Sequence, residues 1–137
     1  MKISILIGLI FMWSNAIANP FFKDHQLVLF YASTCHYCQQ FAPIIEKWSQ
    51  ANGAKLVAFS LDNKPLDSLH DFQPATTQII NTAYAGRPIT YPALFIAHQT
   101  RGLLYPVAFG ALGYEELSDR LSQIQFKIEN YEARKLA

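Results

Sequence analysis

Short apolar runs alternate with segments of helical periodicity along most of the chain. Continuous apolar runs bounded by polar or turn residues predict buried strands at 27–31, 55–61, 93–97 and 103–109. Apolar positions three and four residues apart predict helices over 35–50, 75–84 and 114–131. The resulting order, β-α-β-α-β-β-α, predicts an α/β fold with a central mixed four-stranded sheet flanked by helices.

Prolines and cap residues refine these boundaries. Thr34 is the expected N-cap of the first helix, and Pro43 predicts a kink inside it. Residues 62–74 form an expected long loop between the second strand and the second helix. Pro106 lies within the last predicted strand, which indicates an edge position or a bulge.

The first 18 residues have the pattern of a secretory signal peptide. A positive flank at Lys2 precedes an apolar run over 3–13, and Ala-Ile-Ala at 16–18 fits the small-residue cleavage rule. The alternative is an uncleaved anchor, but a bilayer span needs about 20 apolar residues. We therefore expect cleavage after Ala18, with residues 19–137 forming a single domain exported to the periplasm.

Composition and charge exclude several classes of function. The 137 residues are 51% hydrophobic and 15% charged, with a formal net charge of +1, which is typical of a folded globular protein. No run of Lys or Arg provides the positive stripe that nucleic-acid binding requires. Nucleic acid is therefore not an expected partner.

The only two cysteines, Cys35 and Cys38, follow the first predicted strand at the start of the first predicted helix. A cross-link between them would enclose two residues and restrict little chain entropy, so it would be a poor structural staple. Unpaired N–H groups and the helix dipole at a helix N-terminus favour a thiolate, which is the nucleophile in thiol–disulfide exchange. The position of Cys35 therefore indicates a redox centre.

Cys38 lies three residues after Cys35, on the same face of the predicted helix, so its sulfur can reach that of Cys35. We assign Cys35 as the attacking nucleophile and Cys38 as the buried resolving thiol, which together would form a redox disulfide Cys35–Cys38. His36 and Tyr37 lie between them, and we expect these two residues to tune the redox balance.

These motifs resemble the thioredoxin superfamily over about residues 27–128. The resemblance rests on a strand leading into C-x-x-C, on Pro43 five residues later, on Pro92 opening the third strand, and on Gly-Ala-Leu at 110–112 before a final amphipathic helix. The stretches "VLFYASTCHYCQQFAPIIEKWSQ", "FSLDNKPLDS" and "TYPALFI" are most similar to the periplasmic thiol-disulfide isomerases of F-type conjugation systems, the TrbB/TraF family.

This resemblance implies a thioredoxin-like fold and a cis Tyr91–Pro92 bond beside the cysteines, with Tyr91 pairing with the substrate backbone. It implies a protein thiol-disulfide isomerase or oxidoreductase that acts on cysteine-containing exported proteins, such as components of conjugative pilus or type IV secretion assembly. A membrane thiol donor or acceptor would recycle the cysteines. The chain departs from the superfamily pattern at Leu29, where cytosolic thioredoxins carry a buried acid, and at Tyr91, where periplasmic isomerases often have Thr.

Two other functions remain open at the level of the sequence. One is a thioredoxin-fold assembly factor that binds peptides without redox activity, and the other is a copper chaperone. We expect no cofactor and no structural metal site, because His25, His70 and His98 are isolated in the sequence and structural zinc normally needs four ligands.

Overall fold

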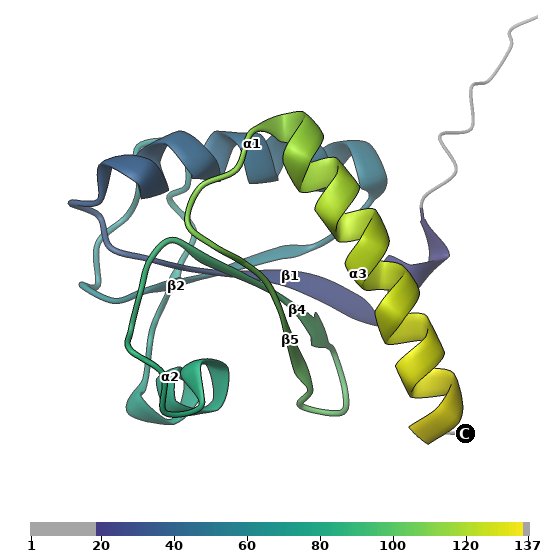
Figure 1. Ribbon diagram of the computed structural model, residues 1–137. Helices are drawn as coiled ribbons and strands as arrows, with labels where there is room; N and C mark the ends of the chain where they lie inside the picture. The colour runs from purple at the N-terminus through teal and green to yellow at the C-terminus, as the bar shows by residue number, and fades with distance from the viewer. Residues whose placement is uncertain (1–18, 136–137) are drawn as a thin grey trace, which may run out of the picture.

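A computed structural model describes residues 19–135, so the predicted signal peptide at 1–18 lies outside the described residues. Within this range one mixed sheet is covered by helices on both faces (Figure 1). The elements in chain order are η1 (Pro20–Lys23), β1 (His25–Tyr31), α1 (His36–Asn52), β2 (Leu56–Ser60), β3 (Gln73–Pro74), α2 (Thr77–Tyr84), β4 (Ala93–His98), β5 (Leu104–Phe109) and α3 (Tyr114–Lys135). Among residues 19–135, no helix combines the length and the apolar character needed to cross a bilayer.

The strand order is β3-β2-β1-β4-β5, with β1 in the centre. β2 runs parallel to β1, whereas β4 runs antiparallel to both β1 and β5. Successive side chains of β1 point to opposite faces, and both faces are apolar: Leu27 and Leu29 belong to one core cluster, while Val28 and Phe30 belong to the other. A strand buried on both faces reads as the continuous apolar run seen in the sequence.

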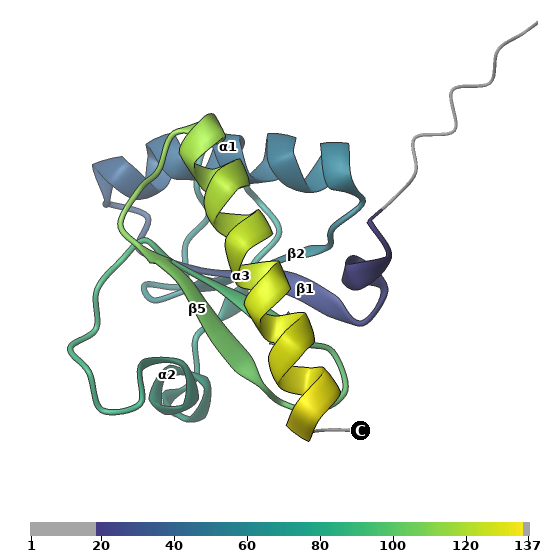
Figure 2. The same ribbon diagram turned by 45° about the vertical axis from the view of Figure 1, so that its right-hand side comes forward.

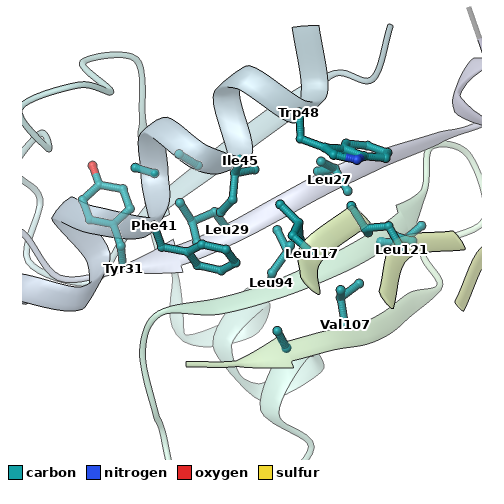
Figure 3. Close-up of a cluster of buried hydrophobic side chains, with 14 of the residues drawn as sticks. Leu27, Leu29, Tyr31, Phe41, Ile45, Trp48, Leu94, Val107, Leu117 and Leu121 are labelled. Carbon is teal, nitrogen blue, oxygen red and sulfur yellow. The ribbon is translucent and has the colours of Figure 1, made fainter. Parts of the chain in front are cut away.

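Helices α1 and α3 cover one face of the sheet, and α2 covers the other (Figures 1 and 2). The larger core lies under α1 and α3, where Phe41, Ile45 and Leu117 are fully buried against the leucines of β1 and β4 (Figure 3). The smaller core packs Tyr84 of α2 edge-on to Phe30, at 5.6 Å between ring centroids. The predicted thioredoxin-like arrangement of layers is therefore present.

The sheet has five strands rather than the predicted four. The expected loop at 62–74 ends in the two-residue strand β3, in which Gln73 pairs with Phe59 and Pro74 with Ser60. Both residues of β3 are exposed, so the segment carries no apolar pattern from which a strand could be predicted.

Two prolines carried predictions: Pro106 in the last strand and Pro43 in the first helix. Pro106 lies in β5, which is an edge strand with a register shift: Leu94 pairs with Ala108 and Phe95 pairs with Pro106, leaving Val107 as the extra residue. The edge position and the bulge are both confirmed. Pro43 lies inside α1, which continues as one helix on both sides of it, and the kink expected there stays a prediction.

Leu117 provides a test of the larger core. Replacing Leu117, which is fully buried in α3, by Ala removes apolar contacts and leaves a cavity, so we expect the free energy of unfolding to fall by about 2–5 kcal/mol. Urea unfolding followed by circular dichroism measures the change. Phe126→Ala on the same helix is the control, because this larger side chain is 66% exposed and its loss should change stability by no more than about 0.5 kcal/mol. Equal effects of the two substitutions would contradict the assigned packing of α3.

Candidate functional site

Cys35 itself is the N-cap of α1. Its backbone is extended, with φ −82° and ψ 114°, and its sulfur accepts the backbone N–H of Cys38 at 3.2 Å. The prediction that Thr34 caps this helix is therefore wrong by one residue. The sulfur of Cys35 takes the place that a hydroxyl or carboxylate oxygen occupies at an ordinary N-cap.

This position favours negative charge on the sulfur of Cys35. The first N–H groups of a helix have no partner within the helix, and the positive end of the helix dipole lies at the same point. Cys35 is partly exposed, so its sulfur can meet another disulfide from solvent. The local geometry is that of an accessible nucleophile held against hydrogen-bond donors.

Cys38 lies one turn further along α1 and is fully buried. Burial, followed by the hydrogen bond with Cys35, raises the pKa of the Cys38 thiol to about 12. Cys38 is therefore a neutral thiol at neutral pH, adjacent to Cys35 but out of reach of large reagents. Both thiols are free in this structure.

The Tyr91–Pro92 peptide bond is cis, as predicted. It precedes β4 and brings the carbonyl oxygen of Tyr91 to 4.0 Å from the sulfur of Cys35. Pro92 is buried, and its carbonyl oxygen accepts the N–H of Gly110 at 2.8 Å, which attaches this turn to the end of β5. The structure thus brings the cysteine pair, Cys35 and Cys38, together with Tyr91 and Pro92, which lie more than 50 residues later in the sequence.

The two residues between the cysteines point outward. Tyr37 is 63% exposed, and the His36 ring lies beside it with 5.8 Å between ring centroids. Nε2 of His36 lies 3.1 Å from Nε2 of Gln40, one turn further along α1. The redox-tuning roles of His36 and Tyr37 stay predictions.

Asp62 is a residue of this site that the sequence analysis missed. Its carboxylate accepts the backbone N–H of Ser33 at 3.0 Å and the hydroxyl of Ser60 at 3.0 Å, and the hydrogen bonds from Ser33 lower its pKa. It therefore joins the turn before Cys35 to the end of β2. The available signal was topological: Asp62 follows the parallel neighbour of β1, so both strand ends lie at the same edge of the sheet.

Leu29 is fully buried in the larger core. The position at which cytosolic thioredoxins carry a buried acid is therefore occupied by an apolar side chain that packs under α1 and α3. The exposed carboxylate of Asp62 lies near enough to Cys38 for its charge to add to the raised pKa of that thiol.

The expectation that the histidines are isolated is wrong for two of the three. His25 pairs with His98 across the antiparallel β1–β4 ladder, and their rings lie 4.9 Å apart between centroids. Both lie beside Glu132 of α3. His70 is separate: it is exposed in the loop, where its ring lies 3.0 Å from the carbonyl of Asp67.

Comparison with known proteins relates the chain to one family. The family model described as "TraF: F plasmid transfer operon protein" matches residues 16–122. The chain is also similar to Protein TrbB of Escherichia coli (strain K12), with 25% identity over 88 residues. This match covers 64% of the chain and 49% of TrbB, so the chain spans about half the length of that relative.

Solved structures share the fold at low sequence identity. A thiol:disulfide interchange protein of the thioredoxin family from Chlorobium tepidum matches with a TM-score of 0.55 and 16% identity, over 77% of this chain and 82% of that chain. A thioredoxin-related protein from Neisseria meningitidis serogroup B matches with a TM-score of 0.51 and 17% identity, over 73% and 84%. At these identities the likeness identifies the thioredoxin fold.

The difference between the two cysteines predicts selective modification. In the reduced protein near pH 7.5, iodoacetamide should modify Cys35 and leave Cys38 unmodified, because Cys38 is buried and has a raised pKa. Mass spectrometry of the resulting peptides measures both rates. In a Cys35→Ser variant, modification of Cys38 should stay slow near pH 7.5 and become faster only at alkaline pH, because burial is the largest cause of its raised pKa.

Unfolding in guanidinium chloride is the control for this experiment, because both cysteines should then react at similar rates. Equal rates in the folded protein, or faster modification of Cys38, would contradict the assignment of Cys35 as the accessible thiol.

Proposed function

Because this chain belongs to the TraF family of F plasmid transfer operon proteins, we propose that it is a thiol-disulfide oxidoreductase or isomerase that acts on exported proteins. One observation carries the proposal: the partly exposed sulfur of Cys35 accepts the Cys38 N–H at the start of α1, 4.0 Å from the Tyr91 carbonyl. Nucleophile, resolving thiol and substrate-facing backbone are then within one site.

The proposed reaction starts with attack of the Cys35 thiolate on one sulfur of a client disulfide. A bond forms between Cys35 and that sulfur, the client S–S bond breaks, and the second client sulfur leaves as a thiolate. Helix N–H groups stabilise Cys35 both as the nucleophile and as a leaving group, because the same negative charge develops on its sulfur in each case.

The mixed disulfide can resolve in two ways. In reduction, Cys38 attacks the sulfur of Cys35, the client sulfur leaves reduced, and two electrons pass to the client while Cys35 and Cys38 form a disulfide. The departing client thiolate is a base that can accept the proton of Cys38. In isomerisation, a second client thiolate attacks the client sulfur instead, and Cys35 leaves as a thiolate with both active-site thiols still reduced.

Exposed apolar side chains lie between the cysteines and in the segment that leads to the cis proline, and they suit unfolded or partly folded clients. Tyr37 lies between the cysteines, Tyr91 precedes the cis proline and Ile89 is two residues further upstream, with exposed fractions of 63%, 46% and 51%. We propose that these side chains contact the apolar residues of a client while Tyr91 pairs with its backbone.

The cellular context is part of the proposal. Removal of a signal peptide at 1–18 would place the enzyme in the periplasm, where disulfides persist. The family relationship supports clients among conjugative pilus or type IV secretion components, with a membrane thiol donor or acceptor for recycling.

The same apolar surface favours a second candidate function, an assembly factor that binds peptides without redox chemistry. The two functions differ in their need for sulfur. Replacing both cysteines by serine would abolish the function of an exchange enzyme and leave the function of a peptide-binding factor intact.

A trapping experiment tests the proposed function. A Cys38→Ala variant expressed with its signal segment should accumulate mixed disulfides between Cys35 and client proteins, because the resolving thiol is missing. Non-reducing gels and mass spectrometry of the purified adducts identify the clients. Purified wild-type protein should also reactivate scrambled ribonuclease in a glutathione buffer, with activity reduced at least tenfold in Cys35→Ser.

The matched control is the Cys35→Ser/Cys38→Ala double variant, which should form no adducts. If the Cys38→Ala variant traps nothing and the wild-type protein neither reduces nor reshuffles disulfides, the enzyme proposal fails.

A further inference from the structure

Two histidines and a glutamate converge at the end of the sheet remote from the cysteines. His25 begins β1 and His98 ends β4, while Glu132 belongs to the last turns of α3. One ligand atom from each of the three lies within 4.8 Å of the other two. β1 extends over seven residues between His25 and the turn before Cys35, which separates this cluster from the cysteines by roughly 20 Å.

The sheet register explains why these side chains meet. His25 is the cross-strand partner of His98. Both continue the face of the sheet to which Leu27 of β1 and Ile96 of β4 contribute, because side chains two residues apart in a strand share a face. This face is covered by α3, and Glu132 reaches His25 with its two carboxylate oxygens 2.9 and 3.1 Å from Nε2.

The His25 ring is held in the orientation that a metal ligand requires. Its Nδ1 lies 3.0 Å from the carbonyl oxygen of Phe21; because a carbonyl can only accept, Nδ1 carries the hydrogen. With Nε2 also protonated, Nε2–H donates to Glu132 as an ion pair. A metal ion would replace that proton and bind the Nε2 lone pair, which faces Glu132. The ring also stacks on Phe21 at 3.9 Å and is only 5% exposed, so its orientation is fixed by packing.

The other two groups also have supporting partners. The Tyr105 hydroxyl donates to Oε1 of Glu132 at 2.9 Å, and hydrogen bonds of this kind orient ligating carboxylates. Nδ1 of His98 makes long contacts with Thr100, 3.3 Å to its N–H and 3.4 Å to its hydroxyl. The Thr100 N–H donates to Nδ1, which therefore accepts, and this contact holds the His98 ring in place beside Glu132.

We infer that His25, His98 and Glu132 form a binding site for a divalent transition-metal ion, of which Zn²⁺ is the best match. Two imidazoles and one carboxylate are an established set of zinc ligands that leaves a fourth position for water, and imidazole also favours late first-row metals over Mg²⁺ or Ca²⁺. The histidines are far apart in the sequence, which led us to expect no metal site. The pairing of β1 with β4 makes His25 and His98 neighbours.

A bound ion would join α3, through Glu132, to the paired ends of β1 and β4. β1, β4 and α3 would be joined by coordination bonds, and binding to the folded state alone would stabilise it in proportion to the logarithm of the free metal concentration. The site would therefore act as a metal-dependent clamp on the C-terminal part of α3.

Zinc titration of the full chain tests this inference. Because thiols also bind zinc, the measurement uses the Cys35→Ser/Cys38→Ser background, with competition against a chromogenic chelator to determine affinity. We expect one equivalent of Zn²⁺ to bind, and we expect His98→Asn and Glu132→Gln each to weaken binding at least tenfold. His70→Asn is the matched control, since this exposed histidine lies outside the cluster, and it should leave the affinity unchanged.

A second measurement does not depend on the variants remaining folded. Long-range ¹H–¹⁵N spectra of the histidine rings should show ring-nitrogen signals of His25 and His98 shifting on addition of Zn²⁺, with those of His70 unchanged. Failure of the cysteine-free protein to bind zinc at millimolar concentration would overturn the inference. Binding that is unaffected by His98→Asn and Glu132→Gln, or that leaves the His25 and His98 signals in place, would overturn it as well.

Discussion

The hydrogen bond from the Cys38 N–H to the sulfur of Cys35 is the interaction on which the account of this protein depends. It makes Cys35 both the cap of α1 and the candidate nucleophile. It also sets the difference between the two thiols, because the helix that begins at one sulfur carries the other into the core. The same peptide groups that begin the helix therefore stabilise charge on the sulfur that must react.

The rest of the fold serves to hold this helix start against the cis proline. β1 is buried on both faces and delivers the chain to Cys35, while its antiparallel neighbour β4 begins directly after Pro92. The larger core under α1 and α3 fixes the helix on the sheet, as Figure 3 shows for Phe41 and Ile45. Asp62 ties the turn before Cys35 to β2. Cys35, Asp62 and Pro92 therefore lie at the same end of the sheet.

Local pattern was enough to predict the elements and the cysteine centre, because both depend on neighbouring residues. The continuous apolar run of β1, the helical spacing of α1 and α3, and Pro106 at an edge bulge each carry a signal within a few residues. Pro92 was placed beside the cysteines by family resemblance, since nothing in its own surroundings indicates a contact more than 50 residues away.

Three features could not be predicted from the sequence: the short strand β3, the cap of α1 and the cluster of His25, His98 and Glu132. β3 has two exposed residues and no apolar pattern. Thr34 has the side chain expected of a cap, and only the path of the turn places the sulfur of Cys35 there instead. His25 and His98 are more than 70 residues apart and become neighbours through antiparallel pairing, so neither spacing nor composition could reveal their meeting with Glu132.

A redox titration in glutathione buffers tests the central claim most directly. The protein is equilibrated over a range of ratios of reduced to oxidised glutathione and quenched with an alkylating reagent. Its mass is then measured by mass spectrometry. The account predicts one two-electron transition between the dithiol and an internal Cys35–Cys38 disulfide, which disappears when either cysteine is replaced. Thiols that stay reduced throughout, or a wild-type protein that accumulates only separate glutathione adducts, would contradict it.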